Sequence, residues 1–312
     1  MGRVRVVAPA RLHLGMLAVA GDDARRFGGL GVSVSRPAVV LEAERADELS
    51  AEGADADRAL TFARRCRDAL GLEGGAHLRV VEAIPQHVGL GSGSKLALAV
   101  AQALATLEGR DVDAPGLAEA AGRAARSAVG TWTFALGGLV VEGGHRPGVE
   151  RQAPLLARHP VPDEWRAVLV VPAAAPGLSG GAEEEAFGQL VPAPERSATI
   201  AQLVLTSLLP ALVEGELDEF GAALTRIQQL VGDSFAVAQG GRFHPRAGPL
   251  VEALLHFGAA GAGQSSWGPT VYGVVGSEAA GRQLAGRMED VAGEGTVDVV
   301  AFDNRGARVE RS

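Results

Sequence analysis

The sequence predicts an α+β protein built from two domains, and three observations lead to that prediction. The 312 residues are enough for two medium-sized domains, each with its own core. Short β-branched runs alternate with longer runs rich in alanine and leucine, which is typical of mixed strands and helices. A proline-rich stretch over residues 147–162 separates two such patterns, so we expect domains at 1–160 and 161–312.

The expected elements follow in order along each half. In residues 1–160, β-branched runs predict strands at 4–10, 38–44, 77–83 and 138–144. Apolar periodicity predicts helices at 57–70 and 94–107. In residues 161–312, the same reasoning predicts strands at 166–172, 271–275 and 296–302, and helices near 197–213, 216–231, 247–257 and 278–290.

Composition excludes several classes of function. A formal net charge of −8 argues against the broad basic surface that sequence-independent binding of nucleic acid requires. The single cysteine, Cys66, permits no intramolecular disulfide, and the first residues carry arginines rather than a signal sequence. We therefore expect a cytoplasmic protein with no membrane or nucleic-acid partner. Positive charge is carried almost entirely by arginine, and the one lysine is Lys95.

The strongest motif is the glycine-rich segment 84–95, Ile-Pro-Gln-His-Val-Gly-Leu-Gly-Ser-Gly-Ser-Lys, between a strand and a helix. Glycines let backbone N–H groups approach a ligand, and the unpaired amides and dipole of a helix N-terminus favour an anion such as phosphate. The simpler interpretation is a glycine turn with Ser94 as the helix N-cap. The spacing matches neither a Walker A loop nor a dinucleotide-binding fingerprint.

This segment resembles the central motif of the GHMP family of small-molecule kinases. Residues 9–15 and 261–270 resemble the first and third motifs of that family. The resemblance implies an N-terminal domain like ribosomal protein S5 domain 2, a ferredoxin-like C-terminal domain and an active site in the cleft between them. However, no acidic residue lies between Glu119 and Glu142, where many of these kinases carry a catalytic aspartate.

A second resemblance is more specific. The blocks at 28–32, 137–145, 177–187 and 264–273 are similar to β-ribofuranosylaminobenzene 5′-phosphate synthases, which have the GHMP fold but are not kinases. It implies a decarboxylative C-ribosyltransferase that joins phosphoribosyl pyrophosphate (PRPP) to an aromatic acid and releases CO2 and pyrophosphate. The acceptor is an aminobenzoate, a hydroxybenzoate or, as in the C-glycoside synthases of formycin and pyrazofurin biosynthesis, a pyrazole dicarboxylate. An ATP-dependent kinase and a non-catalytic phosphate-binding protein remain alternatives.

The resemblance also implies site residues. For catalysis it implies Arg11 and His13 of the first motif, although His13 fits an ordinary half-buried histidine equally well. Lys95 is added as a catalytic candidate for its place at the phosphate loop, although it departs from the family, where an uncharged polar residue is expected. The PRPP phosphates are expected to contact Gly89, Gly91, Ser92, Gly93, Ser94, Lys95, Gly263, Gln264, Ser265 and Ser266. The ribose and the acceptor are expected to contact Arg26, Gly28, Gly29, Thr131 and Trp267, with Trp267 either stacking on the acceptor or filling space between the domains.

Two further expectations concern the metal and the lone lysine. Mg²⁺ is expected on the pyrophosphate, held mainly by phosphate oxygens and water. Glu183–Glu185 are expected chiefly to form the exposed first turn of a helix, although one of them could reach the metal. Lys95 is expected beside an anionic group, so that Lys95→Ala impairs turnover more than stability. The family resemblance suggests a homodimer.

Overall fold

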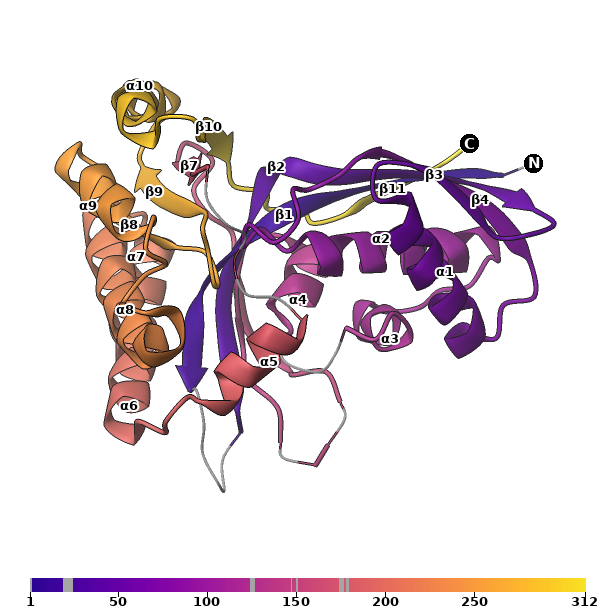
Figure 1. The fold of residues 1–312 in the computed structure, drawn as a ribbon, viewed down its shortest axis with the longest axis horizontal. Helices are drawn as coiled ribbons and strands as arrows, with labels where there is room; N and C mark the ends of the chain where they lie inside the picture. The colour runs from indigo at the N-terminus through magenta and orange to yellow at the C-terminus, as the bar shows by residue number, and fades with distance from the viewer. Residues whose placement is uncertain are drawn as a thin grey trace.

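The structure is a computed structural model that describes residues 2–18, 25–123, 127–146, 148–149, 151–173, 177 and 180–312. Two sheets organise the described chain, and each sheet has helices packed against it (Figure 1). The long strands β1 (Arg3–Ala18) and β2 (Phe27–Ala46) run from the first sheet towards the helices of the second half, as Figure 1 shows. Residues near the ends of these two strands therefore meet the second half of the protein.

The first sheet has seven strands in the described residues. Its main path is β11-β1-β2-β4-β3, and β5 and β6 continue it from β2. The remaining strands are β3 (Ser50–Gly53), β4 (Gly75–Glu82), β5 (Leu139–Glu142), β6 (Leu155–His159) and β11 (Arg308–Arg311). Four helices lie below it in Figure 1, α1 (Ala56–Leu70), α2 (Ser92–Leu107), α3 (Ala114–Ala120) and α4 (Val129–Leu136). Helix α2 is buried along nearly its whole length, as its alanine and leucine content predicts.

The second sheet has the ferredoxin-like order that the resemblance implies. Its four strands run β10-β7-β9-β8, which is fourth, first, third and second in chain order, and every neighbouring pair is antiparallel. These strands are β7 (Arg166–Val171), β8 (Gly261–Gln264), β9 (Val271–Val275) and β10 (Thr296–Ala301). The helices of this half are α5 (Gly180–Gly188), α6 (Pro194–Leu203), the π-helix η1 (Val204–Leu208), α7 (Leu209–Glu214), α8 (Leu217–Gln239), α9 (Gly248–His256) and α10 (Glu278–Ala292).

The expected α+β class is confirmed, with differences in detail. Strands β1 and β2 extend well beyond the predicted runs, because one end of each joins the seven-stranded sheet and the other end reaches the second half. Strand β11 pairs with β1, so the last residues of the chain return to the first sheet. The segment 161–312 therefore contributes to both sheets.

One helical stretch, Pro194–Glu214, is long and apolar enough to cross a bilayer. Only 28% of its most apolar window is buried, and Leu205 and Val213 are exposed. Length and composition are weak evidence for a span, because helices of soluble proteins meet the same criteria. The π-helix η1 interrupts the stretch just before Pro210, whose nitrogen has no hydrogen to donate.

Two irregularities in β1 prepare the functional site. Its pairing with β2 shifts register between Pro9 and Arg11, and again between His13 and Gly15. Bulges re-aim side chains and are frequent beside active sites. They lie on either side of the Arg11–His13 segment, which carries two of the predicted site residues.

Candidate functional site

Backbone and hydroxyl contacts bring the three sequence motifs together. The Ser265 hydroxyl accepts the N–H of His13 at 2.9 Å and donates to the Gly89 carbonyl at 2.7 Å. The N–H of Arg11 bonds to the Leu90 carbonyl at 3.2 Å, which joins the first and second motifs directly. Gly89 has φ +91°, and a Cβ there would lie 2.3 Å from the Ser265 carbonyl oxygen. A glycine is therefore required at this crossing.

A cationic cavity of about 370 Å³ opens at the N-terminus of α2. Helix α2 begins at Ser92, and Gly91 precedes it with φ +83°. Arg11, Arg58 and Arg123 line the cavity together with the first turn of the helix. Unpaired amides of a helix start and guanidinium groups both favour phosphate oxygens. This cavity is therefore suited to a polyanionic ligand.

Arg11 lies at the centre of these interactions. Its Nη1 donates to the Gly89 carbonyl, which fixes the guanidinium against the glycine loop. Burial lowers the pKa of Arg11 to about 10, an effect that Glu183 opposes and Arg123 reinforces. The group is consequently still a cation at neutral pH, held in a partly desolvated setting where its attraction for an anion is strengthened.

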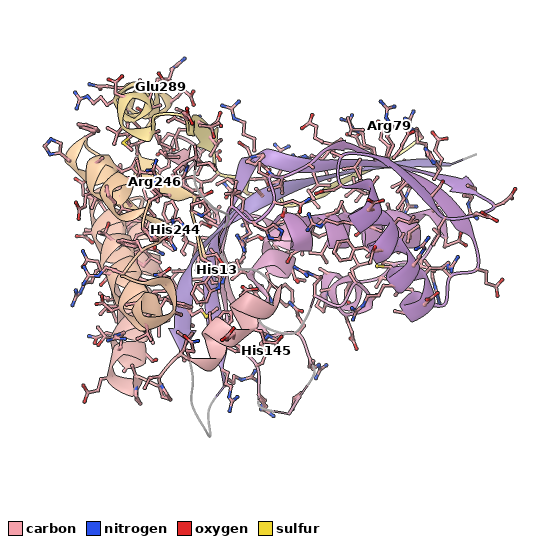
Figure 2. The ribbon with its side chains drawn as sticks, viewed as in Figure 1. His13, Arg79, His145, His244, Arg246 and Glu289 are labelled. Atoms are coloured by element: carbon pink, nitrogen blue, oxygen red, sulfur yellow. The ribbon has the colours of Figure 1, made fainter. Side chains whose placement is uncertain are left out.

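His13 is neutral throughout the physiological range. Burial and, to a smaller extent, the Arg11 charge lower the pKa of its imidazole to about 3. Its Nε2 lies 3.2 Å from the Ser127 hydroxyl. In the ribbon His13 lies near the junction between the two halves of the protein (Figure 2). The imidazole can therefore accept or donate one hydrogen bond there but does not carry positive charge.

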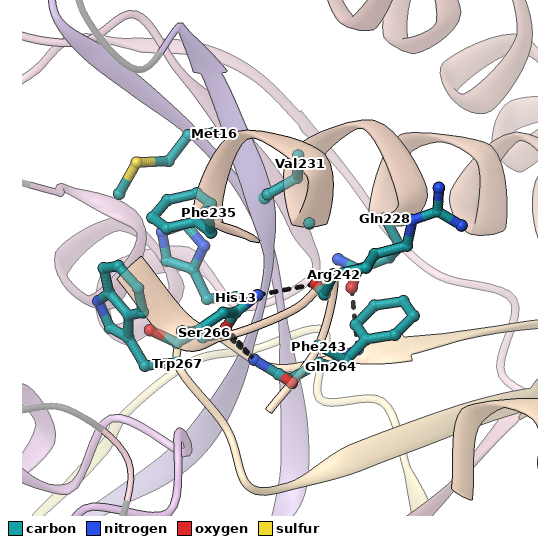
Figure 3. Close-up of a pocket in the computed structure, with 13 residues that line it drawn as sticks. His13, Met16, Gln228, Val231, Phe235, Arg242, Phe243, Gln264, Ser266 and Trp267 are labelled. Atoms are coloured by element: carbon teal, nitrogen blue, oxygen red, sulfur yellow. Dashed lines mark hydrogen bonds between the residues drawn. The ribbon is translucent and has the colours of Figure 1, made fainter. Parts of the chain in front are cut away.

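A second, smaller cavity with aromatic walls adjoins the first (Figure 3). The two cavities share His13, Met16 and Ser266. Trp267 and Phe235 form its apolar wall and pack edge to face, with ring centroids 4.6 Å apart. Its other lining residues are Gly15, Gln228, Val231, Gly232, Gln239, Arg242, Phe243 and Gln264. Flat apolar walls with a few polar groups suit an aromatic ligand.

Only some of the predicted site residues line these cavities. Those that line the cationic cavity are Arg11, His13, Ser92, Gly93, Ser94 and Ser266. Gln264 and Trp267 line the aromatic cavity instead, and Trp267 also packs against Phe187, so it both fills space and forms a ligand wall. The other expected phosphate contacts lie where the motifs pack against neighbouring residues, not among the described lining residues: Gly89, Gly91, Gly263 and Ser265.

The structure places Lys95 away from both cavities, contrary to the contact expected from the sequence. Its side chain is fully buried between α2 and α4, and its Nζ lies 3.0 Å from the Thr133 hydroxyl oxygen. The first turn of a helix presents successive residues to different sides, and Ser92, Gly93 and Ser94 occupy the side that faces the cavity. Burial, assisted by the Arg11 charge, holds the Lys95 pKa well below its usual value despite opposition from Asp303.

The residues expected at the ribose and acceptor have structural roles here. Gly29 has no Cβ because one would lie 2.6 Å from the Glu142 Oε1 atom. Gly28 has φ +58° and lies beside the Glu142 carbonyl. Thr131 is buried in α4, and the backbone of Arg26 bridges to His145. None of these four residues is among the described residues that line the two cavities.

Sequence reasoning missed several groups that the fold brings to the cavities. Arg58 comes from α1 and Arg123 from the turn after α3. A Cβ on Gly93 would lie 3.0 Å from Nη2 of Arg123 and 3.1 Å from Nη2 of Arg58, so both guanidinium groups lie beside the first turn of α2. Arg242 follows α8 and pairs with Asp233, Nε to Oδ1 at 2.7 Å. In a chain with arginine throughout, residue type alone gave no signal for these positions. Leu178 and Ser179, which belong to the block at 177–187, lie outside the described residues.

The described residues contain no cluster of three or more histidine, cysteine, aspartate or glutamate side chains suited to a metal. Glu183 is the one carboxylate among the described residues that line the cationic cavity. Mg²⁺ is commonly held by one or two carboxylates together with substrate phosphates. The available donors therefore fit a magnesium ion that arrives with a polyphosphate substrate.

Comparisons with known proteins identify the family and the fold. Models of the GHMP kinase N-terminal and C-terminal domains match residues 57–138 and 208–292. A β-ribofuranosylphenol 5′-phosphate synthase of Archaeoglobus fulgidus is 33% identical, covering 98% of this chain and 99% of the relative. The protein of that name from Methanothermobacter thermautotrophicus is 30% identical over 96% of both chains. Homoserine kinase from Cytophaga hutchinsonii has a similar fold, with a TM-score of 0.75, 19% identity and coverage of 99% and 97%.

Proposed function

Because this chain belongs to the GHMP kinase superfamily and, within it, to the family of β-ribofuranosylphenol 5′-phosphate synthases, we propose that it is a PRPP-dependent decarboxylative C-ribosyltransferase. The observation that carries the proposal is the pair of adjoining cavities, one cationic and one aromatic. Their shared wall of His13, Met16 and Ser266 is where the ribose of one substrate would meet the ring of the other.

The cationic cavity supports binding of PRPP. This substrate carries a 5′-phosphate and a pyrophosphate, and the cavity offers the α2 N-terminus together with three arginines. Arginine suits phosphate because its planar fork can form two parallel hydrogen bonds. We propose that the α2 amides and Arg11 hold one phosphate group, and that Arg58 and Arg123 hold the other.

The aromatic cavity supports binding of a hydroxybenzoate-type acceptor. The relatives are named for a phenol that bears a ribofuranosyl 5′-phosphate, which favours a hydroxyl over an amino group on the ring. We propose that the carboxylate-bearing carbon lies at the His13 end and that the hydroxyl points towards Arg242. An aminobenzoate or a pyrazole dicarboxylate is the alternative acceptor that turnover measurements would distinguish.

The proposed reaction balances without a covalent intermediate on the protein. The bond from ribose C1 to pyrophosphate breaks and its electron pair leaves with pyrophosphate. The ring carbon that bears the carboxylate then bonds to C1, and the bond to the carboxylate breaks as CO2 departs and the ring regains aromaticity. The protein would position both substrates and stabilise charge. Because His13 is neutral, it would not hold the carboxylate in an ion pair.

Magnesium, when bound, would neutralise the departing pyrophosphate. Glu183 would contribute the protein carboxylate, since it lines the cationic cavity. We expect Glu183→Gln to raise the Mg²⁺ concentration for half-maximal activity about tenfold, with a smaller change at saturating Mg²⁺. Initial rates over a Mg²⁺ series test this. An unchanged Mg²⁺ dependence would show that phosphates and water hold the ion alone. Glu185→Gln, on the exposed side of α5, serves as the control.

Arg242 provides a test of the acceptor site. Its Nε and Nη2 bond to Asp233, while among the described residues no partner is found for Nη1. We expect Arg242→Ala to raise the KM for the aromatic acid about tenfold and to leave the KM for PRPP within twofold, because charge-assisted hydrogen bonds contribute roughly 1.5–3 kcal/mol. If both KM values rise together, the acceptor does not occupy the aromatic cavity separately from PRPP.

One set of incubations tests the function as a whole. The protein is mixed with PRPP, Mg²⁺ and each candidate acid, and release of pyrophosphate and CO2 is measured. Parallel samples contain ATP and the same acids or small alcohols, and ADP is measured. We expect pyrophosphate and CO2 in equal amounts with a hydroxybenzoate. ADP formation without pyrophosphate release would instead establish a kinase, whereas PRPP-induced thermal stabilisation without turnover would indicate a binding protein.

A further inference from the structure

A buried carboxylate, a hydroxyl and the His13 imidazole form a hydrogen-bonded chain behind the shared wall of the two cavities. We propose that Glu142 and Ser127 are positioning residues that hold His13 in its Nε2–H tautomer. Nδ1 is then the ring nitrogen with a free electron pair, on an imidazole that lines both cavities. The catalytic meaning of this inference rests on the proposed function, but the tautomer itself does not.

The geometry of the chain begins with Glu142 at the end of β5. Its side chain is fully buried, and the Ser127 hydroxyl lies 3.5 Å from its Oε1 atom. Ser127 in turn lies 3.2 Å from Nε2 of His13. Ser127 lines the cationic cavity while Glu142 does not. The carboxylate therefore acts on the cavity only through the hydroxyl.

Backbone donors show that Glu142 is arranged as a hydrogen-bond acceptor. The N–H of Gly144 donates to Oε2 at 2.7 Å and the N–H of Ala128 donates to Oε1 at 3.3 Å. His145 also lies near and favours the charged form, while burial opposes it and raises the Glu142 pKa. The fold makes room for the carboxylate at Gly29, where any Cβ would lie 2.6 Å from Oε1. Both oxygens of Glu142 therefore accept backbone hydrogen bonds, in space that Gly29 leaves open.

The direction of the chain fixes the proton on His13. A carboxylate accepts only, so Ser127 donates its single proton to Glu142. The Ser127 oxygen also accepts the N–H of Val129 at 3.3 Å, and it then has capacity to accept from His13. Nε2 therefore carries the imidazole proton, and Nδ1 is bare. Among the described residues no hydrogen-bond partner is found for Nδ1.

The bare nitrogen has a consequence for the reaction. Ribose C1 gains positive charge as pyrophosphate leaves, and the negative end of the imidazole dipole stabilises that charge. The opposite tautomer would present an N–H there, which would repel the developing cation and bond to the acceptor carboxylate. We therefore expect the tautomer to affect kcat more than the KM for PRPP.

Glu142→Gln tests the direction of the chain. The strong Gly144 bond should keep the amide oxygen at the Oε2 position and place the amide NH2 beside Ser127. Ser127 would then accept from the amide and donate to Nε2, which forces the proton of His13 to Nδ1. We expect the ¹⁵N shifts of the two ring nitrogens to exchange character in histidine-labelled protein, with His13 assigned by comparison with His13→Gln. With a hydroxybenzoate as acceptor, kcat should fall at least about tenfold.

Ser127→Ala and Ser127→Thr provide a second test if the first variant does not fold. Ser127→Ala should leave His13 as a mixture of tautomers with intermediate ¹⁵N shifts, whereas Ser127→Thr should restore the wild-type shifts. Ser33→Ala is the matched control, because Ser33 is a fully buried serine of β2 whose hydroxyl donates to the Ala10 carbonyl at 3.4 Å. Its ¹⁵N spectrum and kcat should match those of the wild type.

The two levels of inference fail differently. Wild-type shifts for His13 in both Glu142→Gln and Ser127→Ala would overturn the positioning role, whatever the activity. Exchanged shifts in a protein that never releases pyrophosphate would support the chain and overturn the proposed function. Exchanged shifts with unchanged kcat would show that the tautomer is fixed but does not serve catalysis, which also overturns the proposal.

Discussion

Replacing Arg11 by lysine is expected to lower kcat/KM for PRPP about 100-fold. The substitution keeps the positive charge but removes the planar fork that donates to the Gly89 carbonyl and faces the cationic cavity. Losing one preorganised donor at a developing anion typically costs 100-fold or more. Because the charge remains near His13, the low pKa of the imidazole should persist, which separates the effect of geometry from the effect of charge.

Steady-state kinetics with varied PRPP at saturating acceptor measure the effect. Arg79→Lys is the control, since Arg79 is an exposed arginine of β4 that pairs with Glu42 and Glu52 and lies far from His13 (Figure 2). It should leave kcat/KM unchanged. Activity within threefold of the wild type in Arg11→Lys would mean that Arg11 contributes only its charge, and that the glycine loop binds phosphate without the fork.

Much of the fold was predictable from hydrophobic periodicity. The expected strands 166–172 and 271–275 correspond to β7 and β9, and the expected helix 278–290 corresponds to α10. The short strand β8 was missed because its sequence, Gly-Ala-Gly-Gln, has the composition of a loop. It forms a strand because helix α8 packs directly on it, and a Cβ on Gly261 would lie 2.4 Å from the Gly221 carbonyl oxygen. Packing against α8, and not the local sequence, therefore determines strand β8.

The site was predictable only where a motif defines the backbone. The loop at 89–94 and the Arg11–His13 segment follow from local glycine patterns and a resemblance. Arg58, Arg123 and Arg242 come from separate helices or turns, and only the fold brings them to the cavities. Glu142 illustrates the same limit. The sequence showed that no acid lies in the preceding stretch, but not that the next acid turns back to Ser127.

Lys95 shows how burial can reverse a prediction from composition. A lone lysine at a phosphate loop suggested a catalytic ammonium, yet the side chain lies in the interior and is hydrogen-bonded to Thr133. The Thr133 hydroxyl donates its own proton to the Val129 carbonyl at 2.6 Å, so it does not depend on Lys95. The methylene stem fills core volume, and the amine is a desolvated polar group. These two parts have opposite effects on stability.

Two substitutions separate those effects. Lys95→Ala should lower the free energy of unfolding by about 3 kcal/mol, because it leaves a cavity in a close-packed core. Lys95→Met keeps the stem volume and removes the amine, so it should raise the free energy of unfolding at neutral pH by at least about 1 kcal/mol. Both should retain most of the kcat of the folded protein. Urea denaturation and steady-state rates measure the two quantities, and a large loss of kcat in Lys95→Met would return the lysine to a catalytic role.

The pH dependence of the same pair gives an independent check. Burial lowers the pKa of Lys95 in the folded state, whereas the unfolded chain has the ordinary value of 10.5. Between these two values the unfolded state binds one more proton, so wild-type stability gains about 1.4 kcal/mol per pH unit as pH rises. Lys95→Met lacks this gain, while other titrations are common to both proteins. Its stability advantage should therefore be largest near neutral pH and shrink as pH approaches 10.5. An advantage that stays constant with pH would mean that the amine is charged in the folded state, with an acidic group such as Asp303 compensating it.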